Sequence, residues 1–145
     1  MQEIKIKIKY HDPDLQSIRL TPGGDWFDLR AAEDVHLRAG EFRLISLGVS
    51  MKLPDGYEAH IVPRSSTYKT WGIIQANHMG VVDNSYSGTN DVWMFPAIAF
   101  VETDIHKNDR ICQFRIVKKQ DEVQFITVDE LDGTDRGGFG STGIK

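Results

Sequence analysis

The sequence predicts an all-β fold, a jelly-roll-like β-barrel or sandwich with one short helix, and three observations support this. Apolar and polar residues alternate over several short segments, which is the period of a half-buried strand. Clusters of Gly, Pro, Asn and Asp separate these segments, as expected for turns. Only residues 65–71 combine capping signals with helical composition, and this helix has two turns at most. Many short strands with regular turns are typical of sandwiches and barrels.

The first half of the chain supplies four strand candidates and the helix. Residues 4–9 alternate isoleucine with lysine, and short apolar segments follow at 27–32 and 42–51. Residues 53–57 read as a turn with proline at its second position, and 57–63 alternate again. Ser65 or Ser66 can cap the helix that follows, and Gly72 can end it.

The second half predicts a hairpin, two further strands and a flexible arm. Segments 72–82 and 92–101 are apolar and flank the turn-rich residues 83–90, so we expect them to pair. In 110–117, Cys112, Phe114 and Ile116 share one face and Gln113 lies on the other. Residues 123–128 form the last predicted strand. Residues 136–145 contain four glycines and little apolar mass, so we expect one β domain at 1–135 and a flexible arm at 136–145.

Composition excludes several classes of protein. The 145 residues are 40% hydrophobic and 26% charged, which fits neither a disordered nor a membrane protein. A net charge of −4 argues against a protein that coats nucleic acid, and the six acids in residues 120–135 are not interrupted by any Lys or Arg. One cysteine, Cys112, excludes an intramolecular disulfide and is expected to be a buried hydrophobe rather than a nucleophile. The opening residues lack the apolar core of a signal peptide, so we expect a cytoplasmic setting.

Common catalytic motifs are missing or out of context. The five histidines lack zinc-ligand spacing, and the chain has neither a Walker A loop nor a Gly-x-Ser-x-Gly elbow. Residues 138–143 match Gly-x-Gly-x-x-Gly, but no helix follows, so a dinucleotide fold is not indicated. This segment could be a flexible tail, or an arm whose backbone N–H groups approach a phosphate.

Two segments are candidates for binding or catalysis. Arg64, Ser65 and Ser66 end a strand and open the helix, which suits an anion, although the serines could also serve only as caps. Asp83 ends an apolar strand at a tight turn and could be a general base walled by Tyr86, or simple turn chemistry. Asn77 lies upstream, and an amide can read the edge of a nucleobase.

Taken in order, five segments resemble the five motifs of trimeric dUTP pyrophosphatases (dUTPases). They are residues 24–32, 63–66, 77–88, 109–113 and 136–143. The resemblance implies a jelly-roll subunit and a homotrimer with three active sites shared between subunits. Two features depart from the usual motifs: Trp26 stands where a small residue is common, and Arg136 is only three residues from Phe139. The shorter spacing resembles the Bacillus and phage type.

The resemblance also implies roles for individual residues. Asp83 is the general base that activates water, Asn77 reads uracil, and Tyr86 packs under the deoxyribose where a 2′-hydroxyl would clash. The residues expected to hold the phosphates are Arg64, Ser65, Ser66 and Gln113. The arm residues expected to close a neighbour's site are Arg136, Phe139, Ser141 and Thr142. Asp28 positions a hydrated Mg²⁺ ion, which the triphosphate itself chelates.

The implied activity is Mg²⁺-dependent hydrolysis of dUTP to dUMP and diphosphate, which limits uracil in DNA and supplies dUMP for dTMP synthesis. Water attack on a phosphorus needs positioning and charge stabilisation rather than a nucleophilic side chain. One alternative is a dCTP deaminase-like enzyme of the same superfamily. Another is a phage regulatory protein that binds a host repressor, so a host regulatory protein is a further expected partner if the chain is phage-encoded. Neither nucleic acid nor a membrane is expected as a partner.

Overall fold

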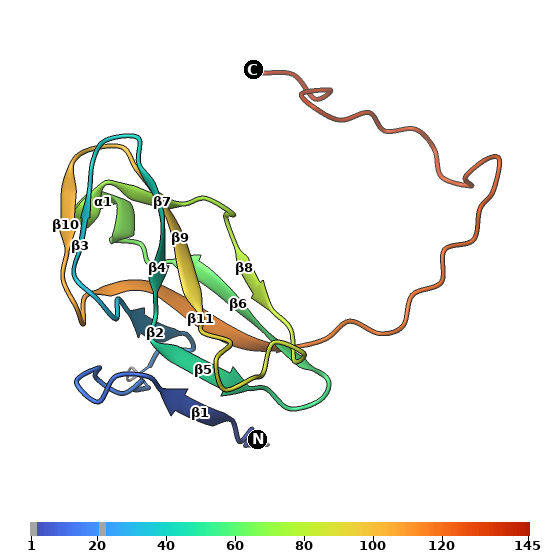
Figure 1. Ribbon diagram of the computed structural model, residues 1–145. Helices are drawn as coiled ribbons and strands as arrows, with labels where there is room; N and C mark the ends of the chain where they lie inside the picture. Colours follow the sequence, from blue (N-terminus) through green and yellow to red (C-terminus); the bar gives the residue numbers. More distant parts are fainter. Residues whose placement is uncertain (1–2, 21–22) are drawn as a thin grey trace.

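Two larger antiparallel sheets form the body of the protein (Figure 1). The computed structural model describes residues 3–20 and 23–145. The first sheet contains, in spatial order, β2 (Phe27–Arg30), β11 (Arg110–Lys118), β6 (Tyr57–Pro63) and β8 (Gly80–Val82). The second contains β4 (Phe42–Ser46), β9 (Met94–Ala99) and β7 (Ile73–Gln75).

Two small sheets and one helix complete the described part of the chain. β1 (Lys7–Tyr10) pairs with β5 (Val49–Lys52), and β3 (Val35–Leu37) pairs with β10 (Thr103–Ile105). The helix α1 (Thr67–Trp71) has five residues. Among the described residues, no helix has the length and apolar character needed to span a membrane. The predicted all-β, jelly-roll-like fold with one short helix is confirmed.

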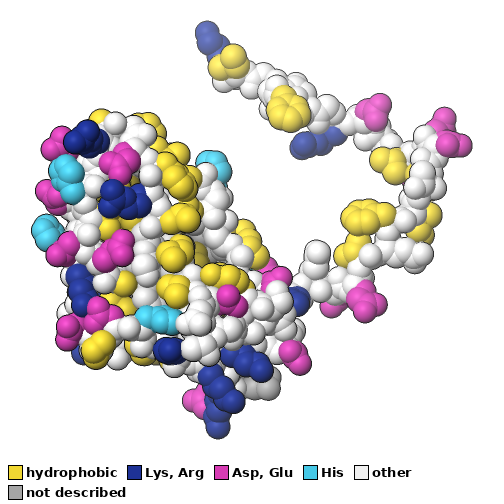
Figure 2. All heavy atoms as spheres, viewed as in Figure 1, with side chains coloured by type: hydrophobic (Ala, Val, Ile, Leu, Met, Phe, Trp, Pro, Cys, Tyr) yellow, Lys and Arg dark blue, Asp and Glu magenta, His cyan; other side chains and the backbone are white. Residues whose placement is uncertain are grey.

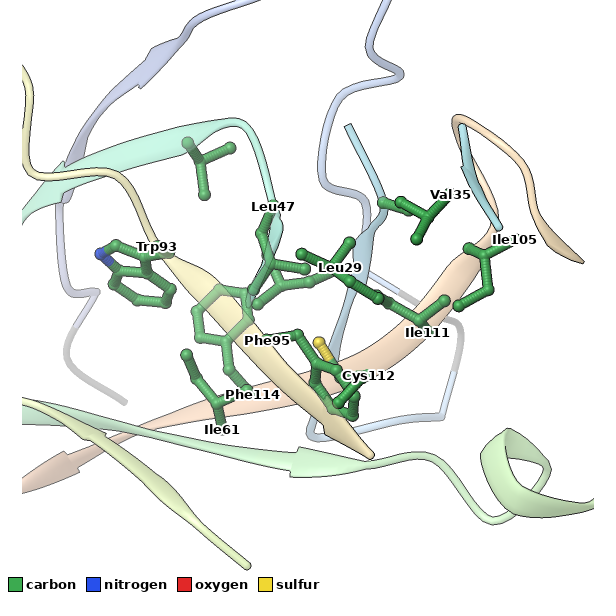
Figure 3. Packing of buried hydrophobic residues seen from close by; sticks show 14 of the residues in the cluster. Leu29, Val35, Leu47, Ile61, Trp93, Phe95, Ile105, Ile111, Cys112 and Phe114 are labelled. Atoms are coloured by element: carbon green, nitrogen blue, oxygen red, sulfur yellow. The ribbon is translucent and has the colours of Figure 1, made fainter. Parts of the chain in front are cut away.

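The hydrophobic core joins the two larger sheets (Figure 3). Phe95 of β9 is fully buried, and the rings of Trp93 and Phe114 meet edge to face with centroids 5.3 Å apart. Offset and edge-to-face aromatic contacts of this kind add to the stabilisation from burial. Cys112 is also fully buried, and burial raises the pKa of its thiol, so it is a core hydrophobe as predicted.

The segment 42–51 forms two strands rather than the single strand predicted. β4 pairs with β9, whereas β5 pairs with β1 in a different sheet. Gly48 lies between them at φ 67°, and a Cβ there would come within 2.7 Å of the Ala32 Cβ atom. Only glycine fits both this conformation and this close approach. The strands β3 and β10 were not predicted, because three residues are too short to establish a period.

The predicted hairpin between 72–82 and 92–101 is only half correct. β7 pairs with β9, but β8 pairs with β6 in the other sheet, where Val82 lies opposite Ala59. The chain turns between β7 and β8, and His78 adopts a positive φ of 60° there. The sequence had suggested that Asn77 lies on the strand that leads to Asp83. Asn77 instead lies in the turn before β8.

The ends of α1 confirm one prediction and correct another. Gly72 follows the helix at φ 65° and its N–H donates to the Tyr68 carbonyl, as expected for a glycine C-cap. Ser66 occupies the N-cap position, but its side chain makes no capping hydrogen bond. The Thr67 hydroxyl instead accepts from the Arg64 N–H at 2.8 Å and donates to the Ile111 carbonyl at 2.8 Å. This leaves the serine hydroxyls uninvolved in capping.

The strand predicted at 123–128 is absent from the structure. After β11, residues 120–145 run away from the body as exposed chain (Figure 1). Phe125 is 92% exposed and Ile126 is 78% exposed. A strand requires a neighbour for its backbone hydrogen bonds, and this segment pairs with no strand in the part of the chain that the structure describes. The exposed part thus begins well before the arm predicted at 136–145.

Candidate active site

A pocket of about 410 Å³ lies where the chain leaves β8. It is lined by residues of β6 and β8, of the following turn, and of the approach to β9: Ile61, Asn77, Gly80, Val81, Val82, Asp83, Ser85, Tyr86, Val92, Trp93 and Met94. The turn is local, since the Tyr86 N–H donates to the Asp83 carbonyl at 3.2 Å. The structure thus brings together the predicted base, the predicted uracil reader and the predicted sugar wall.

Asp83 is held as a carboxylate by its neighbour in sequence. The Ser85 hydroxyl and the Ser85 backbone N–H both donate to Oδ1, at 2.5 and 2.6 Å. These two hydrogen bonds, the side-chain bond first, hold the pKa of Asp83 below its ordinary value. Both of these bonds end on the same carboxylate oxygen, Oδ1.

Tyr86 and Asn77 both belong to the pocket lining. The Tyr86 hydroxyl donates to the Val92 carbonyl at 2.9 Å, which fixes a ring that is 42% exposed. A Cβ added at Gly80 would lie 3.8 Å from Asn77 Nδ2 and 3.5 Å from Gln75 Nε2. The glycine therefore keeps open the space beside both amides.

Sequence reasoning missed Gln75. This side chain is 3% exposed and its Nε2 donates to the Ile61 carbonyl at 3.0 Å. Its Oε1 has no hydrogen-bond partner among the described residues, which is unusual for a buried polar atom. A polar residue at a buried strand position was the available signal.

The predicted phosphate-binding residues form a second cluster, at the end of β6 and along β2 and β11. Arg64 Nε lies 3.1 Å from Asp28 Oδ1, and Arg110 Nη1 lies 3.2 Å from Asp28 Oδ2. Gln113 Nε2 donates to the Pro63 carbonyl at 3.1 Å, beside Arg64 in the chain. Ser65 and Ser66 follow directly and Ser65 is exposed. The cluster thus presents cations and hydroxyls at one edge of the body.

Arg110 was not predicted as a site residue, although it belongs to the fourth segment of the resemblance. It shares the Asp28 carboxylate with Arg64, so Asp28 orients two guanidinium groups at once. Both Asp28 oxygens are engaged, which fits contact with a metal through water better than direct ligation. In the described ranges no group of three or more His, Cys, Asp or Glu side chains could hold a metal ion. These residues therefore do not form a magnesium cage of their own.

The two clusters lie apart within one chain. Val82, next to Asp83, pairs with Ala59 of β6. Arg64 comes five residues after Ala59 and directly follows the last residue of β6. At about 3.3 Å per strand residue, the separation along the strand is about 16 Å. None of Arg64, Ser65, Ser66 and Gln113 lines the Asp83 pocket. One chain thus carries two separate clusters of predicted site residues.

The predicted arm residues contact neither the Asp83 pocket nor the Arg64 cluster. Arg136, Phe139, Ser141 and Thr142 lie in the exposed tail, and the Phe139 ring has no cover from the body. The tail closes only small turns, with the Ser141 N–H donating to the Gly138 carbonyl at 3.1 Å. Figure 2 shows the tail as a separate string of acidic and hydrophobic side chains.

The family model described as dUTPase matches residues 18–143 of this chain. The SPbeta prophage-derived deoxyuridine 5'-triphosphate nucleotidohydrolase of Bacillus subtilis (strain 168) is 60% identical over 142 residues, covering 98% of this chain and 100% of that protein. The deoxyuridine 5'-triphosphate nucleotidohydrolase of Thermobifida fusca (strain YX) is 37% identical over 143 residues, covering 97% of this chain and 79% of that one.

Solved structures support the fold. A Staphylococcus bacteriophage 80alpha dUTPase with dUpNHpp superposes with a TM-score of 0.78 at 18% identity, covering 97% of this chain and 99% of that chain. A dUTPase from phage phi11 of S. aureus, described with a structural Mg(II) ion, gives a TM-score of 0.75 at 16% identity, covering 89% of this chain and 99% of that one.

Proposed function

Because this chain belongs to the dUTPase family, we propose that it hydrolyses dUTP to dUMP and diphosphate by attack of water on the α-phosphorus. The observation that carries this proposal is the pocket that Asp83 shares with Asn77 and Tyr86. It offers an ionised base, an amide and an aromatic wall within one hollow, which suits a uracil nucleotide and an attacking water.

In this mechanism Asp83 orients the water and accepts its proton. Its depressed pKa keeps it ionised at neutral pH, and the Ser85 bonds fix its direction. Asn77 pairs with the uracil edge through one donor and one acceptor. The Tyr86 ring lies under the deoxyribose and excludes a ribose hydroxyl. Positioning of this kind can supply much of the barrier reduction in phosphoryl-type transfers.

The phosphates bind to the Arg64 cluster. Arg64, Ser65, Ser66 and Gln113 supply charged and neutral donors to the triphosphate, and Asp28 keeps the Arg64 guanidinium in place at 3.1 Å. Asp28 would hold a hydrated Mg²⁺ ion, chelated by the triphosphate, through water, and the ion would supply neutralisation of the phosphate charge.

A homotrimer completes the site by combining halves from different subunits. Within one chain, Asp83 and Arg64 lie about 16 Å apart along the direction of β6, which favours such sharing. The outward face of the sheet β4-β9-β7 also favours association, because it is apolar: Phe42, Leu44 and Met94 are 55%, 54% and 41% exposed. Figure 2 contains a column of hydrophobic side chains over the region where Figure 1 places β4 and β9. Apolar patches of this kind mark interaction surfaces.

The arm at 136–145 closes a neighbour's site. Residues 119–135 can extend by up to about 55 Å at about 3.3 Å per residue, enough to reach another subunit. Phe139 then stacks on uracil, while Arg136, Ser141 and Thr142 contact the phosphates. The docking stays conditional on ligand, since the arm offers few apolar anchors.

The reaction fits a cytoplasmic role in nucleotide metabolism. It removes dUTP before it enters DNA and supplies dUMP for dTMP synthesis. The family match disfavours dCTP deamination, the alternative from the same superfamily.

Assays of purified protein with dUTP, dCTP and dTTP, each with and without Mg²⁺, test the proposal. We expect diphosphate release from dUTP alone and only with Mg²⁺. Release of ammonia from dCTP, or equal turnover of dTTP, would contradict it.

A further inference from the structure

A second hollow, of about 300 Å³, includes Asp28 in its lining but not Arg64. Its lining residues are Ser17, Ile18, Arg19, Leu20, Asp28, Arg30 and Arg110. The volume is about ten times the ~30 Å³ share of one water molecule in the liquid. The hollow is therefore roomy enough for an anion of several heavy atoms.

This hollow carries an excess of positive charge. It contains three arginines and one carboxylate, and both oxygens of that carboxylate are engaged by Arg64 and Arg110. Within 3–20 and 23–145, neither Arg19 nor Arg30 forms an ion pair. Arg30 Nη1 donates to the Asn108 carbonyl at 2.7 Å, which fixes its direction but leaves its charge unbalanced.

The electrostatics of Arg30 agree with this imbalance. Burial, followed by repulsion from Arg110, holds the pKa of Arg30 below its ordinary value, while attraction to Asp28 opposes the shift and weaker repulsion from Arg19 and Arg64 adds to it. The group remains charged at neutral pH, because arginine is effectively always protonated in proteins. A protein with a net charge of −4 thus places three arginines around one hollow that has a single carboxylate, Asp28. Placing an anion between them would relieve that repulsion.

We propose that Arg19, Arg30 and Arg110, with the Ser17 hydroxyl, form a second oxyanion site that takes a phosphate-type anion such as inorganic diphosphate. Guanidinium groups offer paired donors that match phosphate oxygens in two-bond contacts. The site is distinct from the Arg64, Ser65, Ser66 and Gln113 group, because none of those four residues lines the hollow. It goes beyond the proposed hydrolysis, which needs one triphosphate site in each active site.

Titration of inorganic diphosphate into the full chain, followed by calorimetry, tests this site. The protein is first saturated with a non-hydrolysable dUTP analogue, so that the substrate phosphates are already placed. We expect one further equivalent of diphosphate to bind per chain. No binding after saturation would overturn the proposal, because diphosphate would then use only the substrate's site.

Variants assign the site to its residues. The double variant Arg19→Gln and Arg30→Gln should raise the Kd of this second equivalent by about tenfold or more, since each charged contact is worth at least that factor. The matched control, Lys7→Gln and Lys52→Gln, removes the same charge from a cross-strand pair on β1 and β5 and should change the Kd by less than about twofold. Equal Kd values for the two double variants would overturn the proposal.

Two further measurements keep the result interpretable. The single variant Arg19→Gln changes an exposed residue, so it tests the site without disturbing the partly buried Arg30. If the analogue itself fails to bind, the proposed hydrolysis fails, and the same variants titrated with diphosphate in the free protein still test the second site.

Discussion

The Asp83 pocket and the Asp28 network are built over very different sequence distances. Asp83 is fixed by Ser85, two residues away, and Tyr86 by Val92, six residues away. Asp28 is fixed by Arg110, which is 82 residues away. The hydrogen bonds that hold Asp83 and Tyr86 can form as soon as their turn forms. The Asp28 network requires β2, β6 and β11 to pair first. In the proposed function, the chemical step belongs to the locally built pocket and phosphate binding to the network that needs three strands.

The largest expected effect is loss of the base in the local half. Asp83→Asn should bind dUTP but lower kcat by about 10²–10⁴-fold, because the swap keeps the shape and removes the basic oxygen. Single-turnover kinetics would measure the chemical step. The matched control is Asp104→Asn. Asp104 lies on β10, does not line the pocket, and its exposed carboxylate pairs with His36 of β3. Turnover of Asp83→Asn within about threefold of the control would remove Asp83 from the base role.

Removal of the arm should have the next largest effect. It tests whether the Asp83 pocket and the Arg64 cluster suffice without the arm. A chain ending at Asp135 should fold, associate and bind dUMP weakly, but hydrolyse dUTP at least about tenfold more slowly, since closure strengthens charge contacts by excluding water. Steady-state kinetics with light scattering would measure both properties. Full activity of the shortened chain would show that the two halves suffice without it.

A smaller effect is expected at the wall of the local half. Tyr86→Ala should lower selectivity for dUTP over UTP by about 1–3 kcal/mol, the scale of small steric exclusion. Tyr86→Phe keeps the ring and loses only the hydrogen bond to the Val92 carbonyl, so it should keep most of the selectivity. The ratio of kcat/KM for the two nucleotides is the measurement, and an unchanged ratio in Tyr86→Ala would place sugar discrimination elsewhere.

The smallest effect should appear only on the acid side of the pH profile. The Ser85 hydroxyl favours the ionised form of Asp83 and so lowers its pKa. In Ser85→Ala this pKa should rise, so activity should begin to fall at a higher pH on acidification, with little change at neutral pH. The pH dependence of kcat measures this shift. An acid limb that does not move, or moves downward, would mean that another group controls it.

The same contrast explains what sequence could predict. Asp83, Ser85 and Tyr86 follow one another, so their turn was readable from residue types. The split of 42–51 into β4 and β5 was not, because it depends on the close approach of Gly48 to Ala32. The role of Arg110 was likewise hidden, because its partner Asp28 is brought near only by pairing of β2 with β11. The apolar residues at 123–128 suggested a strand, but within residues 3–20 and 23–145 no strand pairs with them.

The central claim is that each site combines Asp83 of one subunit with Arg64 of another. Two variants, Asp83→Asn and Arg64→Gln, should each be nearly inactive alone, because each removes one half. Unfolding an equal mixture and refolding it together should form mixed trimers. If the halves come from different subunits drawn at random, about a quarter of the sites receive both intact halves, so about a quarter of wild-type activity should return. If activity stays at the mean of the two separate variants, the site lies within one chain and the account is wrong.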